Sequence, residues 1–508
     1  MRKPVLSVVL LWSLLLPLPA GATEGDTDAN VEVIVVGGEK VISEGVVDHL
    51  QMCSNDLTQR IAGSNRYTTA SSVAKLVDVS GGTAYVASGE QFPDALAAGA
   101  AANATGASLI LVAKTFVPSS SLGTLDRIDP DRIVIVGGTA AIGSAVEDTL
   151  RARYGNVTRI AGPNRYVTAA SISRDAYPGG SDAVIIATGS GYVDALASTP
   201  LAAQLEAPLL LTEPSRLPGA AAGELARLKP AEVFIIGGTA VADAAVEQAI
   251  AATVPGSTVT RLAGPNRYAT ARAIVDLLPQ NPERVLAVTS TDFPDALAAG
   301  AVSGTNPLVL IDEVGLNAVS AGMIESATAI QCEPIVKLGS FTTYHAPGEP
   351  RVTNIHLIAD DVDGAVVLPD QIFSINEHTG QRTEADGYVA AGAIIGGVIV
   401  CCDHPANIGG GTSQFATTLY NAIFYAALED VYHRPHSIYF TRYPLGVEAT
   451  LNWTSPDMKF RNDTTWPVTI DASYTSESIT VDIWGADDGR TMSHTVTGSA
   501  TTSAGGEV

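Results

Sequence analysis

The sequence has little positive charge. Of its 508 residues, 29 are Lys or Arg and 53 are Asp or Glu, which gives a formal net charge of −24 at pH 7. Nucleic-acid binding needs clustered basic side chains that displace counterions from phosphates, so this composition argues against a nucleic-acid partner. A generally acidic surface is more often a means of staying soluble than a ligand site.

Long apolar runs are also missing after the first residues. Beyond residue 22 the sequence has no uncharged apolar stretch of about 18 residues, the length that a membrane-spanning helix needs. The first 22 residues are typical of a secretory signal peptide, with Arg2 and Lys3 followed by an apolar run at 5–16 and small residues at 20–22. We therefore expect a secreted protein, either released or wall-associated, with no integral membrane segment once the signal is removed.

Cysteine is scarce, and the four cysteines are Cys53, Cys332, Cys401 and Cys402. Four cysteines in an exported protein can pair in three ways, and the sequence does not choose between them. Cys401, Cys402 and His404 could bind a metal, but disulfide partners or bystanders are the favoured interpretation. The sequence thus predicts no metal site and no cofactor.

One phrase occurs three times, as Arg-(Ile or Leu)-Ala-Gly-(Ser or Pro)-Asn-Arg-Tyr at 60–67, 159–166 and 261–268. Two other signatures keep the same spacing of about 100 residues: Gly-Gly pairs ending at Gly38, Gly138 and Gly238, and Asp-Ala-Leu-Ala runs starting at Asp94, Asp194 and Asp295. A recurrence of this length indicates repeated small domains. We place them at 31–132, 133–232 and 233–332.

The second repeat shows how such a unit is built. A β-branched run at 133–136 ends at Gly137 and Gly138, and residues 140–154 then carry apolar side chains at helical spacing. Buried runs that alternate with helices predict an α/β fold with a parallel sheet covered on both faces. The loops that follow parallel strands lie on one edge of the sheet, so we expect the three signatures of a unit to meet on one rim.

The rim residues support two interpretations. The asparagines of the phrase are placed to cap helices, and the aspartates lie where a carboxylate meets the positive end of a helix. An Arg and an Asp on one rim often form a structural ion pair, whereas an Arg fork beside a Tyr is suited to a polyanion or a sugar. The candidate ligand-binding residues are Asn65, Arg66, Tyr67, Asp94, Asn164, Arg165, Tyr166, Asp194, Asn266, Arg267, Tyr268 and Asp295.

The three signatures together resemble the cell wall binding repeat 2 family over residues 31–332. That resemblance implies Rossmann-like units around a pseudo-threefold axis that bind anionic wall polymers non-covalently. One departure is that the run Val33 to Gly38 precedes the first phrase, whereas a family unit usually ends with this strand. Our hypothesis is that residues 31–51 complete the third unit and close the ring; pairing of that strand beside Arg60 instead would refute it.

The spacing stops after Cys332, and a separate domain is predicted at 333–485, followed by a flexible tail at 486–508. The most distinctive stretch of the predicted domain is 407–421, where three glycines precede an apolar helix. This stretch, with 368–374 and 457–462, resembles the VanW-like family, whose members are associated with the cell envelope and have no established activity. The resemblance implies an α+β domain. Many members carry Cys where this chain has Ser413.

Ser413 could be a nucleophile beside free backbone N–H groups, with His436 or His433 as its base and Glu448 or Asp457 orienting the ring. In the alternative interpretation, the glycines shape a binding loop, Ser413 caps a helix and the segment 434–436 only packs. We expect non-covalent adhesion to a cell-wall polysaccharide or anionic wall polymer that presents the second domain to peptidoglycan. The alternatives are a peptidoglycan hydrolase or transferase that the repeats only localise, and a structural protein packed into a surface lattice resembling an S-layer.

Overall fold

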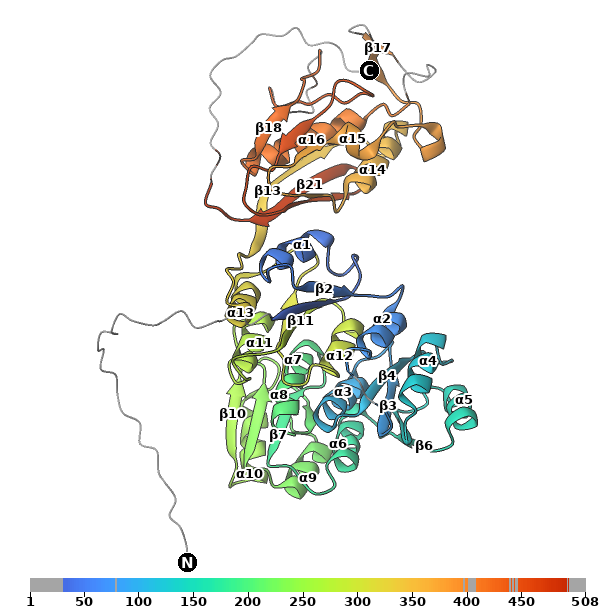
Figure 1. Cartoon of the computed structure of the whole chain (residues 1–508), viewed down its shortest axis with the longest axis vertical. Coiled ribbons are helices and arrows are strands. Elements are labelled where there is room, and N and C mark those ends of the chain that lie inside the picture. The colour runs from blue at the N-terminus through green and yellow to red at the C-terminus, as the bar shows by residue number, and fades with distance from the viewer. Residues whose placement is uncertain are drawn as a thin grey trace, which may run out of the picture.

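The structure is a computed structural model that describes residues 31–77, 80–395, 398–400, 408–437, 440, 443, 446–490 and 492. The predicted signal peptide at 1–22, the residues Cys401, Cys402 and His404, and most of the predicted tail lie outside these residues. No helix within the described ranges is long and apolar enough to span a bilayer. Figure 1 shows three α/β units packed together, with a further domain above them.

Unit I is a four-stranded parallel sheet with the strand order β4-β3-β5-β6. Its strands are short β-branched and aliphatic runs that are almost wholly buried, as expected for a sheet covered on both faces. Its elements are β3 (Thr83–Ser88), α3 (Pro93–Thr105), β4 (Ser108–Val112), α4 (Ser119–Ile128), β5 (Arg132–Val136), α5 (Ser144–Tyr154), β6 (Val157–Ile160) and α6 (Arg165–Ala176).

Unit II repeats this topology, with the order β10-β9-β7-β8. The helix after its first strand is divided into two short helices, α7 and α8, with Pro200 in the first turn of the second. Its elements are β7 (Ala183–Thr188), α7 (Val193–Ala197), α8 (Thr199–Gln204), β8 (Leu209–Thr212), α9 (Gly219–Leu228), β9 (Glu232–Ile236), α10 (Ala244–Thr253), β10 (Thr258–Leu262) and α11 (Arg267–Val275).

Unit III is built from both ends of the repeat region, with the order β12-β11-β1-β2. Strand β1 pairs in parallel with β11 on one side and with β2, which carries Arg60, on the other. Its elements are β1 (Glu32–Val36), α1 (Glu44–Met52), β2 (Thr58–Ile61), α2 (Arg66–Val73), β11 (Arg284–Thr289), α12 (Pro294–Gly300), β12 (Leu308–Ile311) and α13 (Ala318–Thr328).

The amino-terminal segment therefore does complete the third unit, and it does so through two strands. Pairing beside Arg60 and pairing with β11 do not exclude each other, because β2 belongs to the same sheet. The sheets also divide the chain at different points from the expected 31–132, 133–232 and 233–332. Unit I begins at β3 (Thr83–Ser88), and unit II ends its sheet at β10 (Thr258–Leu262).

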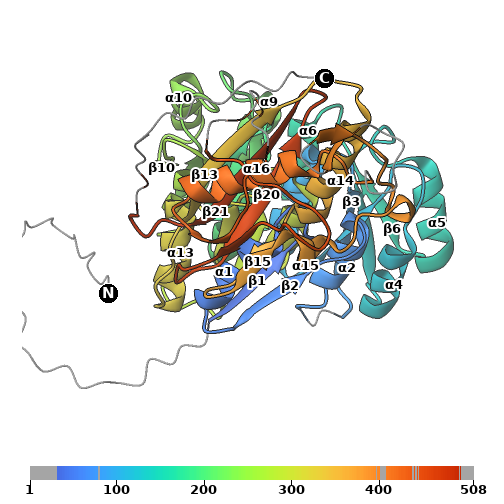
Figure 2. The same ribbon diagram turned by 90° about the horizontal axis from the view of Figure 1, so that it is seen from above.

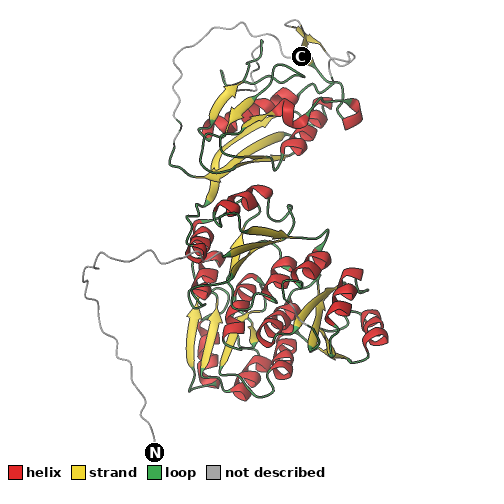
Figure 3. Cartoon of the chain, viewed as in Figure 1, coloured by secondary structure: helices red, strands yellow, loops and turns green. Residues whose placement is uncertain are grey.

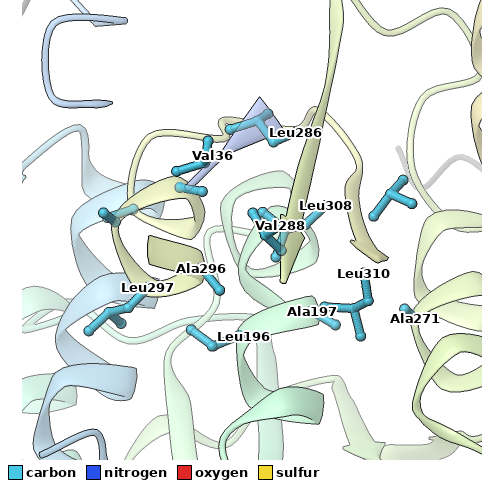
Figure 4. Packing of buried hydrophobic residues seen from close by; sticks show 14 of the residues in the cluster. Val36, Leu196, Ala197, Ala271, Leu286, Val288, Ala296, Leu297, Leu308 and Leu310 are labelled. Carbon is cyan, nitrogen blue, oxygen red and sulfur yellow. The ribbon is translucent and has the colours of Figure 1, made fainter. Parts of the chain in front are cut away.

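The three units surround a pseudo-threefold axis marked by an aromatic triad. Phe92, Tyr192 and Phe293 occupy equivalent positions before α3, α7 and α12, and their ring centroids lie 5.6, 5.9 and 6.0 Å apart. Apolar side chains from different units meet in one core, where Leu196 and Ala197 of unit II lie among Leu297, Leu308 and Leu310 of unit III (Figure 4). The units thus form one packed body.

The C-terminal domain contains the antiparallel sheet β13-β21-β20-β14 and the smaller sheet β15-β19-β18. Helices α14 and α16 pack together on the larger sheet, which gives the expected α+β layers (Figure 3). Its elements are β13 (Ile335–Tyr344), α14 (Pro350–Val362), β14 (Val366–Val367), β15 (Ile372–Ser374), α15 (Ile375–Thr379), η1 (Glu384–Asp386), β16 (Ala393–Ile395), β17 (Val398–Val400), α16 (Thr412–Tyr425), β18 (Glu429–Tyr432), β19 (Lys459–Arg461), β20 (Val468–Tyr474) and β21 (Ser478–Ala486).

The junction between this domain and the repeats is formed by α1 of unit III. Both views place α1 beside the large sheet of the C-terminal domain (Figures 1 and 2). A disulfide joins Cys53, at the end of α1, to Cys332, just before β13. The His49 ring stacks on Trp466 of the C-terminal domain, with 4.4 Å between the ring centroids. Burial lowers the pKa of His49 to about 4, so this ring is neutral at pH 7.

Candidate functional site

The three signatures meet at the carboxyl edge of each sheet, as the sequence predicted. In unit I, Asp94 follows β3, Gly138 follows β5, and Asn164 and Arg165 follow β6. In the strand order, β3 is followed along the chain by its neighbour on one side, β4, and β5 by its neighbour on the other side, β6. The connections therefore diverge between β3 and β5, which makes this edge a topological switch point, the usual ligand position in open α/β sheets. A cavity of about 200 Å³ lies here, lined by these four residues and by Ser88 among others.

We call this edge rim I, defined by Asp94, Gly137, Gly138, Asn164 and Arg165. Rim II comprises Asp194, Gly237, Gly238, Asn266 and Arg267, and rim III comprises Asp295, Gly37, Gly38, Asn65 and Arg66.

The first glycine of each Gly-Gly pair brings the backbone against the aspartate. Gly137 has φ +105°, and a Cβ built on it would lie 2.7 Å from an Asp94 carboxylate oxygen. The corresponding distances are 2.7 Å from Gly237 to Asp194 and 3.2 Å from Gly37 to Asp295. Only glycine accepts both this φ and this close approach. The first glycine of the signature is therefore required by its φ and by its close approach to the aspartate.

The asparagines are helix caps, as predicted. Asn65 and Asn164 each accept two backbone N–H groups at the start of α2 and α6, and Asn266 accepts one at the start of α11. The three aspartates lie in the first turns of α3, α7 and α12. Each rim thus combines the amino ends of two helices, which carry partial positive charge.

The second arginine of each phrase connects neighbouring units. Arg66 of unit III donates from Nη1 to the carbonyl oxygen of Gly89 in unit I at 2.6 Å, and Arg267 of unit II donates to that of Ser290 in unit III at 2.6 Å. Arg165 of unit I donates in the same way to Gly189 of unit II. These bonds run once around the ring, so the structural role that the sequence left open is present.

The tyrosines of the phrase also contact the neighbouring unit. A Cβ added to Gly89 would lie 2.6 Å from the Tyr67 ring, and one added to Gly189 would lie 2.8 Å from the Tyr166 ring. In the third repetition the Tyr268 hydroxyl bonds to Ser290 Oγ at 3.2 Å. Each tyrosine therefore packs on a loop of the next unit, the one that follows β3, β7 or β11, and its ring is half-buried.

The first arginine of the phrase has a different position. Arg159 donates to the carbonyl oxygen of Gly137 at 2.7 Å and to Glu147 of α5 at 2.9 Å. Arg60 and Arg261 make the same bond to the Gly37 and Gly237 carbonyls. This arginine holds the Gly-Gly turn in place, a role that the sequence did not distinguish from that of the second arginine.

Burial raises the pKa of all three rim aspartates. For Asp94 and Asp194, desolvation is the largest cause, and the nearby charge of Arg165 or Arg267 acts in the opposite direction. The pKa of Asp295 rises to about 6, because burial is reinforced by the negative charge of Asp292. Its Oδ1 has no hydrogen-bond partner among the described residues.

Rim III therefore differs in charge from the other two. Asp292 lies 4.0 Å from the Arg66 guanidinium, and the equivalent residues of rims I and II are the uncharged Gln91 and Gly191. Among the described residues, this is the one ion pair that joins a rim arginine to a carboxylate. The predicted ion pair between a rim arginine and its own rim aspartate is therefore not formed, and Arg66 pairs with Asp292 instead.

The aromatic triad is a feature that the sequence reasoning missed. Each member precedes the rim aspartate of its unit by two residues, so the three rims lie around one axis. The guanidinium of Arg165 lies 5.9 Å from the centroid of Phe92, and that of Arg66 lies 5.9 Å from the centroid of Phe293. The recurring aromatic residue two positions before each Asp-Ala-Leu-Ala run was the available signal.

In the C-terminal domain, Ser413 is turned toward the main chain. It lies in the first turn of α16, where its Oγ accepts the N–H of Leu451 at 3.0 Å. His436 lies 2.9 Å from Glu448 through Nδ1, and both side chains are 6% exposed. No hydrogen bond joins Ser413 to His436 or His433 in this part of the structure. The pairing of nucleophile and base required by a catalytic triad is therefore not present.

The two alternative catalytic partners, His433 and Asp457, interact with other side chains. His433 pairs with Asp430 at 2.6 Å and stacks on Tyr420. Asp457 is buried, accepts the hydroxyl of Ser374 at 2.6 Å and contacts no histidine that the structure describes. These residues stabilise the domain where they lie, and Asp457 does not orient His436.

The triple glycine is explained by close packing. A Cβ on Gly410 would lie 2.7 Å from the Ala391 carbonyl oxygen, and one on Gly411 would lie 2.8 Å from Arg351 Cβ. Gly409 donates its N–H to Val389 at 3.2 Å. The glycines therefore let the start of α16 approach neighbouring backbone, which agrees with the interpretation that they shape this loop. The same interpretation expected Ser413 to cap the helix, and this is wrong, because the N-cap residue is Gly411 and no side chain caps α16.

The chain belongs to the family described as cell wall binding domain 2 (CWB2), whose model matches residues 60–147, 159–247 and 261–343. A second family model, described as VanW like protein, matches residues 350–484. Both resemblances inferred from the sequence are thus confirmed, in the same order along the chain.

Three relatives from Bacillus subtilis (strain 168) resemble parts of the chain. The protein named Amidase enhancer is 30% identical over 301 residues, which cover 59% of this chain and 41% of that protein. N-acetylmuramoyl-L-alanine amidase LytC is 27% identical over 264 residues, 52% of each. The uncharacterized protein YoaR is 33% identical over 152 residues, 30% of this chain and 48% of its own. The chain thus spans about half, or less, of these relatives.

Among solved structures, Cwp6 from Clostridium difficile is similar, with a TM-score of 0.49 and 22% identity over 52% of this chain and 43% of its own.

Proposed function

We propose that the protein is an exported envelope protein that holds an anionic wall polymer at rims I, II and III and presents its VanW-like domain to peptidoglycan. The observation that carries this proposal is the cavity of about 200 Å³ in rim I, lined by Arg165, Asn164 and Asp94. The membership in the cell wall binding family and the names of the amidase relatives support a cell-wall-associated protein.

The rim chemistry is suited to a polyanion. Each rim places a guanidinium at the amino end of α2, α6 or α11, and both features attract negative groups. The side chain of Arg66 remains 37% exposed despite its bond to the neighbouring unit. The arginine therefore has a structural contact at Nη1 and retains surface for a ligand.

Three similar rims around one axis are suited to a polymer with repeating charged groups. The aspartates lie two residues from a triad whose centroids are 5.6–6.0 Å apart, so one polymer segment can contact more than one rim. Once the first rim is occupied, the others bind at high effective concentration. Weak contacts at individual rims then suffice for retention on the wall.

The test is retention of the purified protein on isolated bacterial cell walls, before and after the secondary polymers are stripped. We expect Arg165→Gln to lower retention about tenfold, the value of a lost charge-assisted hydrogen bond. Combining it with Arg66→Gln and Arg267→Gln should abolish retention. Arg153→Gln is the matched control, because Arg153 pairs with Asp126 on an exposed surface away from the rims.

Thermal unfolding of each variant separates loss of binding from loss of the ring. Unchanged retention by a folded triple variant, or by a chain without residues 31–332, would show that the rims do not bind the wall. Ser413→Ala and His436→Ala should bind walls as the parent does and leave purified peptidoglycan fragments unchanged, as the parent should. Products formed by the parent and lost in these variants would favour the hydrolase or transferase alternative.

A further inference from the structure

The junction between the repeats and the C-terminal domain contains a group of metal-ligating side chains that neither family assignment explains. His49, Cys53 and Cys332 are all buried, and their ligand atoms lie within 4.8 Å of one another. Within the described ranges, no other group of His, Cys, Asp and Glu side chains has this geometry. Two sulfurs and an imidazole are the ligand set of many zinc sites.

The hydrogen bonding of His49 leaves one nitrogen available. Its Nε2 lies 2.7 Å from the carbonyl oxygen of Glu333, which only accepts hydrogen bonds, so Nε2 carries the ring hydrogen. Nδ1 therefore has a lone pair, and it is buried without a partner in a residue that is 0% exposed. Metal-bound histidines commonly donate their second ring N–H to a backbone carbonyl in this way.

The ring is also held in one orientation, because it stacks on Trp466 at a centroid distance of 4.4 Å. A buried histidine whose ring is fixed by a hydrogen bond and by stacking is prepared for coordination. In the disulfide the two sulfurs are bonded to each other, so they have no thiolate charge to offer a metal. Reduction would change this.

We propose that His49, Cys53 and Cys332 form a redox-gated site for a thiophilic divalent cation such as Zn²⁺, closed by the disulfide and opened by its reduction. The Cα atoms of the two cysteines lie 4.9 Å apart. A ring nitrogen of His49 and the two sulfurs lie within 4.8 Å of one another, so both thiolates and the imidazole can reach one ion. Two thiolates and a neutral imidazole balance the charge of the cation in the buried site. A three-ligand set leaves one coordination position for a water molecule.

The chemistry balances with an external phosphine reductant. The phosphine gives two electrons to the disulfide and becomes a phosphine oxide by taking the oxygen of one water molecule. The two hydrogens of that water end on the two sulfurs as thiols. Binding of the cation then releases two protons as the thiols become thiolates.

The consequence is that α1 stays joined to the start of the C-terminal domain in both redox states, by the disulfide or by the metal.

The experiment uses the full chain in a Cys401→Ser, Cys402→Ser background, so that Cys53 and Cys332 are its remaining thiols. Co²⁺ is the probe, titrated into phosphine-reduced and into oxidised protein without oxygen. We expect one Co²⁺ per reduced chain, with thiolate-to-cobalt charge-transfer absorption in the near ultraviolet, displacement by Zn²⁺, and no such absorption from the oxidised chain.

His49→Ala should weaken Co²⁺ binding by the reduced chain at least about tenfold. His378→Ala is the control, because His378 is exposed and lies in the C-terminal domain, and it should bind Co²⁺ like the parent. If His49→Ala does not fold, the comparison of reduced and oxidised parent chain and the variant Cys332→Ser decide the question. Equal binding by both redox states, no thiolate absorption on reduction, or unaltered affinity in a folded His49→Ala chain would each overturn the proposal.

Discussion

Substitution of Gly137 by alanine tests the geometry of rim I directly. At φ +105° an alanine is strained by about 1–3 kcal/mol. The added Cβ would also lie 2.7 Å from an Asp94 oxygen, so the half-buried carboxylate has to move. We therefore expect Gly137→Ala to lower the free energy of unfolding of the repeats by about 1–3 kcal/mol and to weaken wall retention.

Gly138→Ala is the matched control at the adjacent position. A Cβ on Gly138 would meet nothing within 4 Å, and its φ lies outside the left-handed region. Gly138→Ala should change the free energy of unfolding by no more than about 0.5 kcal/mol, the usual range for a surface substitution. Urea unfolding followed by circular dichroism measures both variants. Equal midpoints for Gly137→Ala and Gly138→Ala would show that the first glycine is not fixed by the aspartate.

Three further predictions follow from single contacts. Retention through rim III should rise as the pH falls below about 6, because protonation of Asp295 removes a negative charge beside Arg66, and Asp295→Asn should flatten that pH profile. Retention that falls on acidification in the same wall assay would contradict this sign. Phe92→Ala should destabilise the repeats by about 1–3 kcal/mol, since it loses two aromatic contacts at the axis, and calorimetry should show a lower melting temperature. His436→Ala should destabilise the C-terminal domain by about 1–3 kcal/mol, because the buried Glu448 carboxylate loses its partner, and Glu448→Gln in the same background should recover part of the loss in urea unfolding.

The sequence predicts much of the repeats because their signals are local. Buried β-branched runs such as 133–136 indicate strands, Gly-Gly pairs indicate tight turns, and Asn164 before a helical segment indicates a cap. Convergence of the signatures also follows, since loops after parallel strands share one edge. The grouping of strands does not follow from local signals, because β1 pairs with β11 at the opposite end of the repeat region as well as with β2. The closure of the ring was expected only from the family resemblance. A repeat spacing of about 100 residues gives the length of a unit and does not say where in the sequence each unit begins. The predicted unit boundaries therefore differ from those of the sheets.

The C-terminal domain shows where local signals mislead. Three glycines before a helix that begins with Thr412 and Ser413 match both an exposed nucleophile and a tight packing contact. The structure distinguishes them by what surrounds the glycines. The Ala391 carbonyl oxygen approaches Gly410, and the Arg351 side chain approaches Gly411. Spacing along the sequence does not choose between Glu448 and Asp457 as the partner of His436. The structure places Glu448 beside His436 and does not place Ser413 there.

The ring gives a physical reason why binding and structural roles coincide in one arginine. Arg165 lines the rim I cavity and also donates to Gly189 of the next unit, so the position of its guanidinium depends on unit II as well as on unit I. The same holds for Arg66 and Gly89, and for Arg267 and Ser290. A single unit cut from the chain would lose the neighbour that holds its arginine. The closed set of three, completed by β1 and β2, is therefore the smallest body in which any one rim has the geometry described.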